Sequence, residues 1–217
     1  IAAMGGGGQP FTLPRALLSQ GSGLLYFVAR ATNGAVDELY RVTLPGGTAT
    51  RLTTTSGGIS GGLVPLGADI YFAATHDTSG AGVIGRELWR WNNAAGQAQL
   101  VTDSINIGPA SALADNNQIA SITAYNGAIY FYATTRADTR ELFRTNGTDA
   151  GTVSVKSLGS GGFFANFYVS NGLLFFSAKA NADDPEQLWF TDGTAAGTKL
   201  VEQTLPLLTG TLTVKVL

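Results

Sequence analysis

The chain has no cysteine, a single histidine and few charged residues. Its 217 residues include 13 Lys+Arg and 15 Asp+Glu, so charged residues make up 13% of the chain, about half of the ~25% that is typical of soluble proteins. Without cysteine there is no disulfide framework, no thiolate nucleophile and no cysteine-ligated zinc. One histidine cannot form a multi-histidine zinc site, and no Gly-x-Ser-x-Gly elbow is present to serve a hydrolase triad.

The charge balance limits the partners. A net charge of -2 argues against a nucleic-acid phosphate track and against a polybasic membrane patch. Apolar runs such as 24–29 are strand-sized, far below the ~20 residues that a membrane-spanning helix needs. The scarcity of charge favours an exported protein. Because the chain opens at Ile1 without a basic and then apolar leader, we expect a processed product or a piece of a longer polypeptide.

Turn-forming residues are abundant, and the chain repeats itself. The 29 glycines and 7 prolines favour many short strands over a helix bundle. An aliphatic residue followed by two aromatic ones occurs four times, and each time a Glu/Gln-Leu-aromatic segment follows. The first aromatic residues are Tyr26, Tyr71, Tyr130 and Phe175, and the segments that follow are 38–41, 87–90, 141–144 and 187–190. Four copies of the same pair of segments, in the same order along the chain, predict a repeat architecture.

Each repeat reads as four short strands. In the third repeat we expect strands over 119–125, 128–134, 140–145 and 151–158. The pairs Asn126-Gly127 and Asn146-Gly147 predict type I′ turns, as do their counterparts in the fourth repeat, Asn171-Gly172 and Asp192-Gly193. The second strand is almost continuously apolar, which indicates that both of its faces are buried.

A thin sheet with two apolar faces must be covered by neighbouring sheets. The sequence therefore predicts an all-β fold, a β-propeller-like array of about four four-stranded blades. The predicted division is a lead-in (1–9), one repeat domain (10–208) and a terminal closing or linking strand (209–217). Within the repeat domain the expected units are 10–55, 56–104, 117–159 and 160–205.

The motif of the last unit, Gln187 to Val201, resembles the bacterial ELWxxDGT repeat family. Residues 141–152 carry a similar motif, with Asn146 where the family has Asp. The second unit keeps Glu-Leu-Trp at 87–89 but has two asparagines in place of Asp-Gly, and the first unit departs further. The resemblance implies a secreted or surface bacterial protein with a propeller-like fold, and it implies no catalytic residues.

Departures from the repeat indicate where a binding site would lie. The second unit has about four extra residues within 76–85, and about ten extra residues lie near 103–118. In a propeller both loops emerge on one rim, where binding usually occurs. The polar candidates are His76, Asp77, Asp103, Asn106, Asp115, Asn116 and Asn117. The alternative is that these are merely tolerated loops.

One tryptophan and one acidic segment are further candidates for ligand binding. Trp91 stands where the other units have threonine, so it is a candidate for stacking on a sugar, with core packing as the alternative. The carboxylates of Asp183, Asp184 and Glu186 could offer oxygen ligands to calcium, but no spaced calcium loop is present and a solvated turn explains them as well. No other cofactor is expected.

Taken together, the sequence predicts a non-catalytic extracellular binding or structural module that recognises a glycan or a protein through one loop face. Two alternatives stay open at this point. One is a propeller hydrolase that uses acidic turn residues as general acid and base. The other is a scaffold subunit of a larger assembly or oligomer, held by its exposed end strands.

Overall fold

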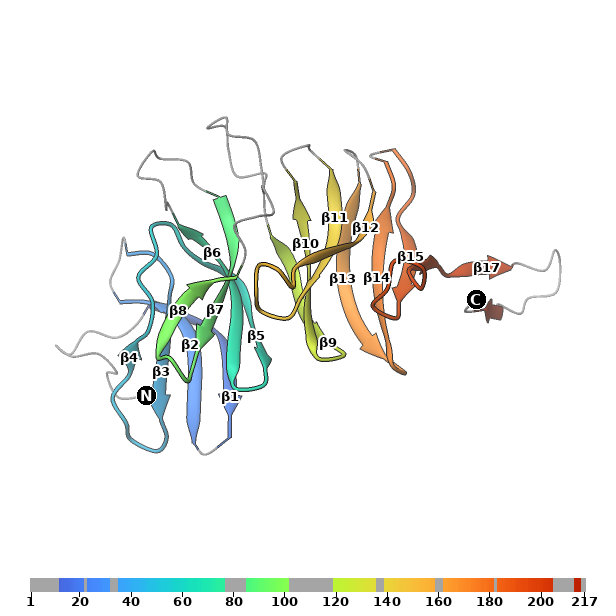
Figure 1. The fold of residues 1–217 in the computed structure, drawn as a ribbon. Coiled ribbons are helices and arrows are strands. Elements are labelled where there is room, and N and C mark those ends of the chain that lie inside the picture. The colour runs from blue at the N-terminus through green and yellow to red at the C-terminus, as the bar shows by residue number, and fades with distance from the viewer. Residues whose placement is uncertain are drawn as a thin grey trace.

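The computed structural model describes residues 12–21, 23–31, 35–76, 85–101, 119–135, 139–158, 162–181, 183–204 and 213–215. This part of the chain is all-β and contains no helix, so none in it could cross a membrane. Its main body is four antiparallel sheets of four strands each, which follow one another in chain order (Figure 1). The predicted array of four-stranded sheets is thus confirmed.

Every sheet is a simple meander in which strands adjacent in sequence are paired. Blade 1 contains β1 (Thr12–Gln20), β2 (Leu24–Arg30), β3 (Glu38–Thr43) and β4 (Thr50–Arg51). Blade 2 contains β5 (Gly58–Leu66), β6 (Asp69–His76), β7 (Gly85–Asn92) and β8 (Gln97–Leu100). Blade 3 contains β9 (Ala120–Tyr125), β10 (Ala128–Thr134), β11 (Arg140–Thr145) and β12 (Val153–Ser157). Blade 4 contains β13 (Phe163–Ser170), β14 (Leu173–Lys179), β15 (Gln187–Thr191) and β16 (Lys199–Leu200).

The first strand of each sheet forms the inner edge of the array. β1 lies beside β5, β5 beside β9, and β9 beside β13, which is the arrangement of sheets around a common axis. Apolar side chains fill the spaces between successive sheets. Leu39, Leu88 and Leu142 of the third strands are each fully buried, and each packs in a cluster with apolar residues of the next blade's second strand. The repeated leucine is therefore the side chain that joins one blade to the next.

All four inner strands contain a β-bulge. The pairing of the first strand with the second is shifted in every blade, and one residue at each shift has a positive φ. These residues are Ala16 (50°), Gly61 (75°), Ser121 (53°) and Asn166 (54°). A bulge bends the strand and redirects its side chains, so the inner edge has the same irregular geometry in each blade.

The turn predictions are confirmed at one position of the repeat and wrong at the other. Asn126-Gly127 and Asn171-Gly172 each have two consecutive positive φ angles, as a type I′ turn requires. At 146–147 and 192–193 only the glycine has a positive φ. The physical reason is that the side chains of the Asp-Gly-Thr motif form a wider loop of their own.

In that wider loop every motif residue has an internal partner. The Thr191 hydroxyl accepts a hydrogen bond from the Gly193 amide (2.9 Å), and Asp192 Oδ1 accepts from the Thr194 amide (2.9 Å) and hydroxyl (2.7 Å). The Thr194 hydroxyl in turn accepts from the Gly197 amide (2.9 Å). Blade 3 repeats these contacts through residues 145–151. These bonds satisfy the loop internally, so the motif needs no ligand to explain it.

Within the terminal segment 209–217, for which a closing or linking strand is predicted, the described residues 213–215 form a strand. The structure describes a two-stranded ladder of β17 (Glu202–Thr204) and β18 (Thr213–Lys215). Pairing with the end of the preceding repeat gives the short β18 a hydrogen-bonding partner. The lead-in predicted at 1–9 lies outside the described residues.

Candidate functional site

A cavity of about 250 Å³ lies between blades 2 and 3 at the inner edge of the array. Its walls are the bulged segments of β5 and β9, together with single residues of β6 and β7. The residues that line it are Ser60, Gly61, Gly62, Val64, Ala73, Arg86, Ile119, Ser121 and Ile122. The space exists because both inner strands bend at this junction and because two of its walls are glycines without side chains.

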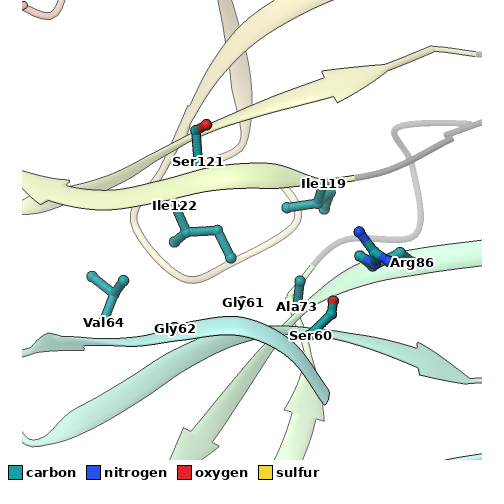
Figure 2. A pocket seen from close by; sticks show the side chains of 9 residues that line it. All are labelled: Ser60, Gly61, Gly62, Val64, Ala73, Arg86, Ile119, Ser121 and Ile122. Carbon is teal, nitrogen blue, oxygen red and sulfur yellow. The ribbon is translucent and has the colours of Figure 1, made fainter. Parts of the chain in front are cut away.

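The lining is polar at one end and aliphatic at the other. Figure 2 shows Ser60 and Arg86 at the end near Ile119, whereas Val64 and Ile122 face each other at the opposite end. The Ser60 hydroxyl is buried and has no hydrogen-bond partner, and a buried polar atom without one is costly. None of these nine residues is acidic or a histidine. The described lining can thus offer a cation, a hydroxyl donor and an apolar wall, and none of its nine side chains is a carboxylate or an imidazole that could act as a general base.

At the neighbouring junction the same place is filled by an ion-pair network. Arg15 of β1 donates to the carbonyl oxygens of Gly61 (2.8 Å) and Ile59 (2.7 Å) on β5, and to Asp37 Oδ2 (2.7 Å). Asp37 Oδ1 also accepts from Arg30 Nε (2.7 Å). Burial by itself would raise the pKa of Asp37, but the hydrogen bonds and charges of Arg30 and Arg15 outweigh it and hold this pKa below its ordinary value.

Most of the polar residues predicted for a loop-face site fall outside the described residues. These are Asp77, Asp103, Asn106, Asp115, Asn116 and Asn117. His76 is the last residue of β6, where its backbone pairs with Gly85. The two predicted insertions join β6 to β7 and β8 to β9, so Arg86 and Ile119 of the cavity lie next to their ends in the chain. The described ends of both loops therefore meet the cavity between blades 2 and 3.

Trp91 lies in the core rather than on a rim. Its side chain is only 5% exposed and packs with apolar residues of blades 1 and 2. The indole N–H donates to Asn93 Oδ1 (2.9 Å), which also accepts from the Tyr26 hydroxyl (2.9 Å). The Trp91 ring packs between blades 1 and 2, so a sugar could stack on this ring only if the ring left that interface.

The acidic residues near 183–186 do not converge on a common point. Asp184 Oδ2 accepts hydrogen bonds from the Asn181 amide (3.0 Å) and side chain (2.8 Å), so this carboxylate closes a local turn. Glu186 is exposed. Within the described ranges no three His, Cys, Asp or Glu residues gather as a metal site would require.

The sequence did not single out Ser60 or Arg86. Both are ordinary residues in a turn-rich repeat, and the bulge that opens the cavity has no strong residue signature. The strand register is what relates them to the preceding blade. Ser60 takes the position of Arg15, because Arg15 pairs with Val28 and Ser60 with Ala73. Arg86 takes the position of Asp37, because it precedes Glu87 as Asp37 precedes Glu38.

No family model and no curated protein matches the sequence. Solved structures do match its fold. One is a nidogen/laminin complex (TM-score 0.54, 12% identity, 89% of this chain and 66% of that chain). Others are TolB from Acinetobacter baumannii (0.54, 15%, 82% and 40%) and the Pyrococcus horikoshii acylaminoacyl peptidase (0.57, 12%, 86% and 26%). The chain spans less than two thirds of the length of each of these chains. At such identities the likeness concerns the fold alone, and that fold is the β-propeller.

Proposed function

We propose that the protein is a non-catalytic binding module and that the cavity between β5 and β9 is its ligand site. The observation that carries the proposal is the buried Ser60 hydroxyl without a partner, inside a cavity that also contains Arg86. Small-molecule sites are typically concave, largely apolar and supplied with a few convergent polar groups. The cavity has this composition, and the nine described residues that line it include no carboxylate, whereas a glycosidase would need two.

The ligand would be part of a glycan or of another protein, and the protein would act outside the cell or on its surface. The low charge content and the resemblance of 187–201 to a surface repeat family support this location. A cavity of about 250 Å³ is slightly smaller than the ~300–1,000 Å³ of drug-sized sites. It would therefore receive an end group or one side chain of a larger partner.

The test is a binding screen on glycan and peptide arrays with two matched variants. Gly62→Leu would block the cavity, because Gly62 is exposed at its wall and a Cβ there meets no atom within 4 Å. Ser154→Leu on β12 places the same side chain on an exposed strand of blade 3 away from the cavity. We expect ligands that bind the wild type to bind Gly62→Leu at least tenfold more weakly and Ser154→Leu unchanged. An empty screen, or equal binding to Gly62→Leu, would contradict the proposal.

A further inference from the structure

The first two junctions between blades have opposite charges at one equivalent position, where Asp37 stands in the first and Arg86 in the second. At the junction of blades 1 and 2, the inner strand supplies the cation Arg15 and the segment before the third strand supplies the anion Asp37. At the junction of blades 2 and 3, the inner strand supplies Ser60 and the segment before Glu87-Leu88 supplies Arg86. At the second junction the cation Arg86 thus stands where the first junction has the anion Asp37, and the inner strand supplies only the hydroxyl of Ser60.

The surroundings of these two positions are otherwise repeated. Arg15 is held by the carbonyl oxygens of Ile59 and Gly61 on the next inner strand. Their counterparts are Ile119, just before β9, and Ser121 on β9, which both line the cavity. Gly61 and Ser121 share the positive φ of the bulge (75° and 53°). The cavity is therefore the volume that a side chain from the chain itself fills one junction earlier.

The geometry points to an aliphatic carboxylate as the ligand of this cavity, specifically the C-terminal carboxylate of a peptide that ends in a small aliphatic residue. This inference rests on the proposed function, since it names the ligand of the same site. A guanidinium pairs with a carboxylate through two parallel hydrogen bonds. Arg86 would supply these bonds, and the buried Ser60 hydroxyl would supply one donor that now has no acceptor.

The rest of the lining selects the body of the ligand. Val64 and Ile122 face each other at the end of the cavity away from Arg86 (Figure 2). The Ser121 side chain lies on the opposite side of β9 from Ile122 in the same view, whereas Ser60 lies beside Arg86, so Ser60 is the hydroxyl placed to act together with that cation. A uronic acid would bring several hydroxyl groups to an aliphatic wall, where they would lose their water without gaining partners. A C-terminal valine or alanine fits both ends of the cavity, because its carboxylate suits the polar end and its side chain suits the aliphatic end.

The experiment compares N-acetyl-valine, its amide N-acetyl-valinamide, and glucuronate as probes, with affinities measured by NMR titration of the full chain. We expect N-acetyl-valine to bind at least tenfold more tightly than the amide or glucuronate. Arg86→Gln should remove the preference for the carboxylate over the amide. Arg140→Gln is the matched control, because Arg140 is the corresponding arginine one blade later and donates to the Gly162 carbonyl (3.1 Å); it should leave the preference intact.

A double variant provides a test in which folding is monitored separately. Ser60→Arg with Arg86→Asp recreates the Arg15–Asp37 pair of the preceding junction, so we expect an unchanged or higher Tm together with loss of N-acetyl-valine binding. Tighter binding of the amide or of glucuronate, or a carboxylate preference that persists in Arg86→Gln, would overturn the inference. If array ligands still depend on Gly62 while carboxylates fail, the site stands and only the ligand class is wrong. If no binding depends on Gly62, the proposed function itself fails.

Discussion

Leu142 and Leu188 hold the same place in consecutive blades, yet Leu142 is fully buried and Leu188 is 49% exposed. The difference arises because Leu142 faces blade 4, where Phe164 and Phe176 cover it, whereas blade 4 is the last four-stranded sheet of the described chain. Tyr168, on the inner strand of blade 4, is also exposed (69%). The face of blade 4 that points away from blade 3 is thus exposed, whereas the equivalent faces of the other three blades are each covered by the next sheet.

This difference predicts unequal costs for one substitution at equivalent positions. Leu142→Ala should lower the free energy of unfolding by about 2–5 kcal/mol, because it removes buried methyl groups and leaves a cavity. Leu188→Ala should lower it by only about 1 kcal/mol, since half of that side chain is already in water. Urea denaturation of both variants measures the two values. Equal losses would mean that another surface covers Leu188 in solution.

Much of this architecture could be predicted from sequence, because it depends on periodic signals. The four aromatic pairs and the Leu-aromatic segments recur in register, and the structure places them at equivalent points of four sheets. A strand such as 128–134 is apolar at almost every position, which only burial on both faces explains. A strand assignment that rests on many repeated positions does not depend on the conformational preference of any single residue.

The cavity could not be predicted in the same way, because it depends on what is missing from a repeated position. Ser60 is significant only when compared with Arg15, and this comparison requires the bulged register of the inner strands. For a related reason, the sequence predicts a two-residue turn at 146–147 where the structure has a wider loop. Asn-Gly favours a type I′ turn locally, but the hydroxyls of Thr145 and Thr148 form hydrogen bonds that stabilise a wider loop.

The glycine of the Asp-Gly-Thr motif is expected to be intolerant of any side chain. Gly193 has a φ of 99°, and a Cβ there would overlap the Tyr130 hydroxyl of the preceding blade. Gly172→Ala is the matched control, because Gly172 also has a positive φ (73°) but open space around it. We expect Gly193→Ala to be less stable than Gly172→Ala by about 1–3 kcal/mol, the usual range for overpacking. Tyr130→Phe should recover part of this loss in a double-mutant cycle, and no recovery would assign the cost to the backbone alone.

The Arg15–Asp37–Arg30 cluster should make stability depend on pH in the acid range. The pKa of Asp37 lies below its ordinary value of 3.8 in the folded chain, so the cluster contributes stability above pH 3.8. That contribution is lost as the pH falls through the lowered pKa, because the folded state then has to take up a proton that the unfolded state already binds. The stability difference between the wild type and Asp37→Asn, measured by urea denaturation from about pH 7 to about pH 2, should be constant above about pH 4 and shrink as the pH falls below 3.8. A constant difference over this range would contradict the role of the ionised carboxylate.

The bulges of the inner strands offer a test of backbone strain alone. Ala16 and Gly61 occupy equivalent positions with φ angles of 50° and 75°, and a Cβ at Gly61 would meet no atom within 4 Å. A residue with a Cβ costs about 1–2 kcal/mol in this left-handed region, whereas glycine adopts it freely. We therefore expect Gly61→Ala to lose about 1 kcal/mol and Ala16→Gly to gain up to about 1 kcal/mol in urea denaturation. If Ala16→Gly instead destabilises the chain, the methyl group of Ala16 contributes more by packing against the apolar cluster of blades 1 and 2 than it costs in backbone strain.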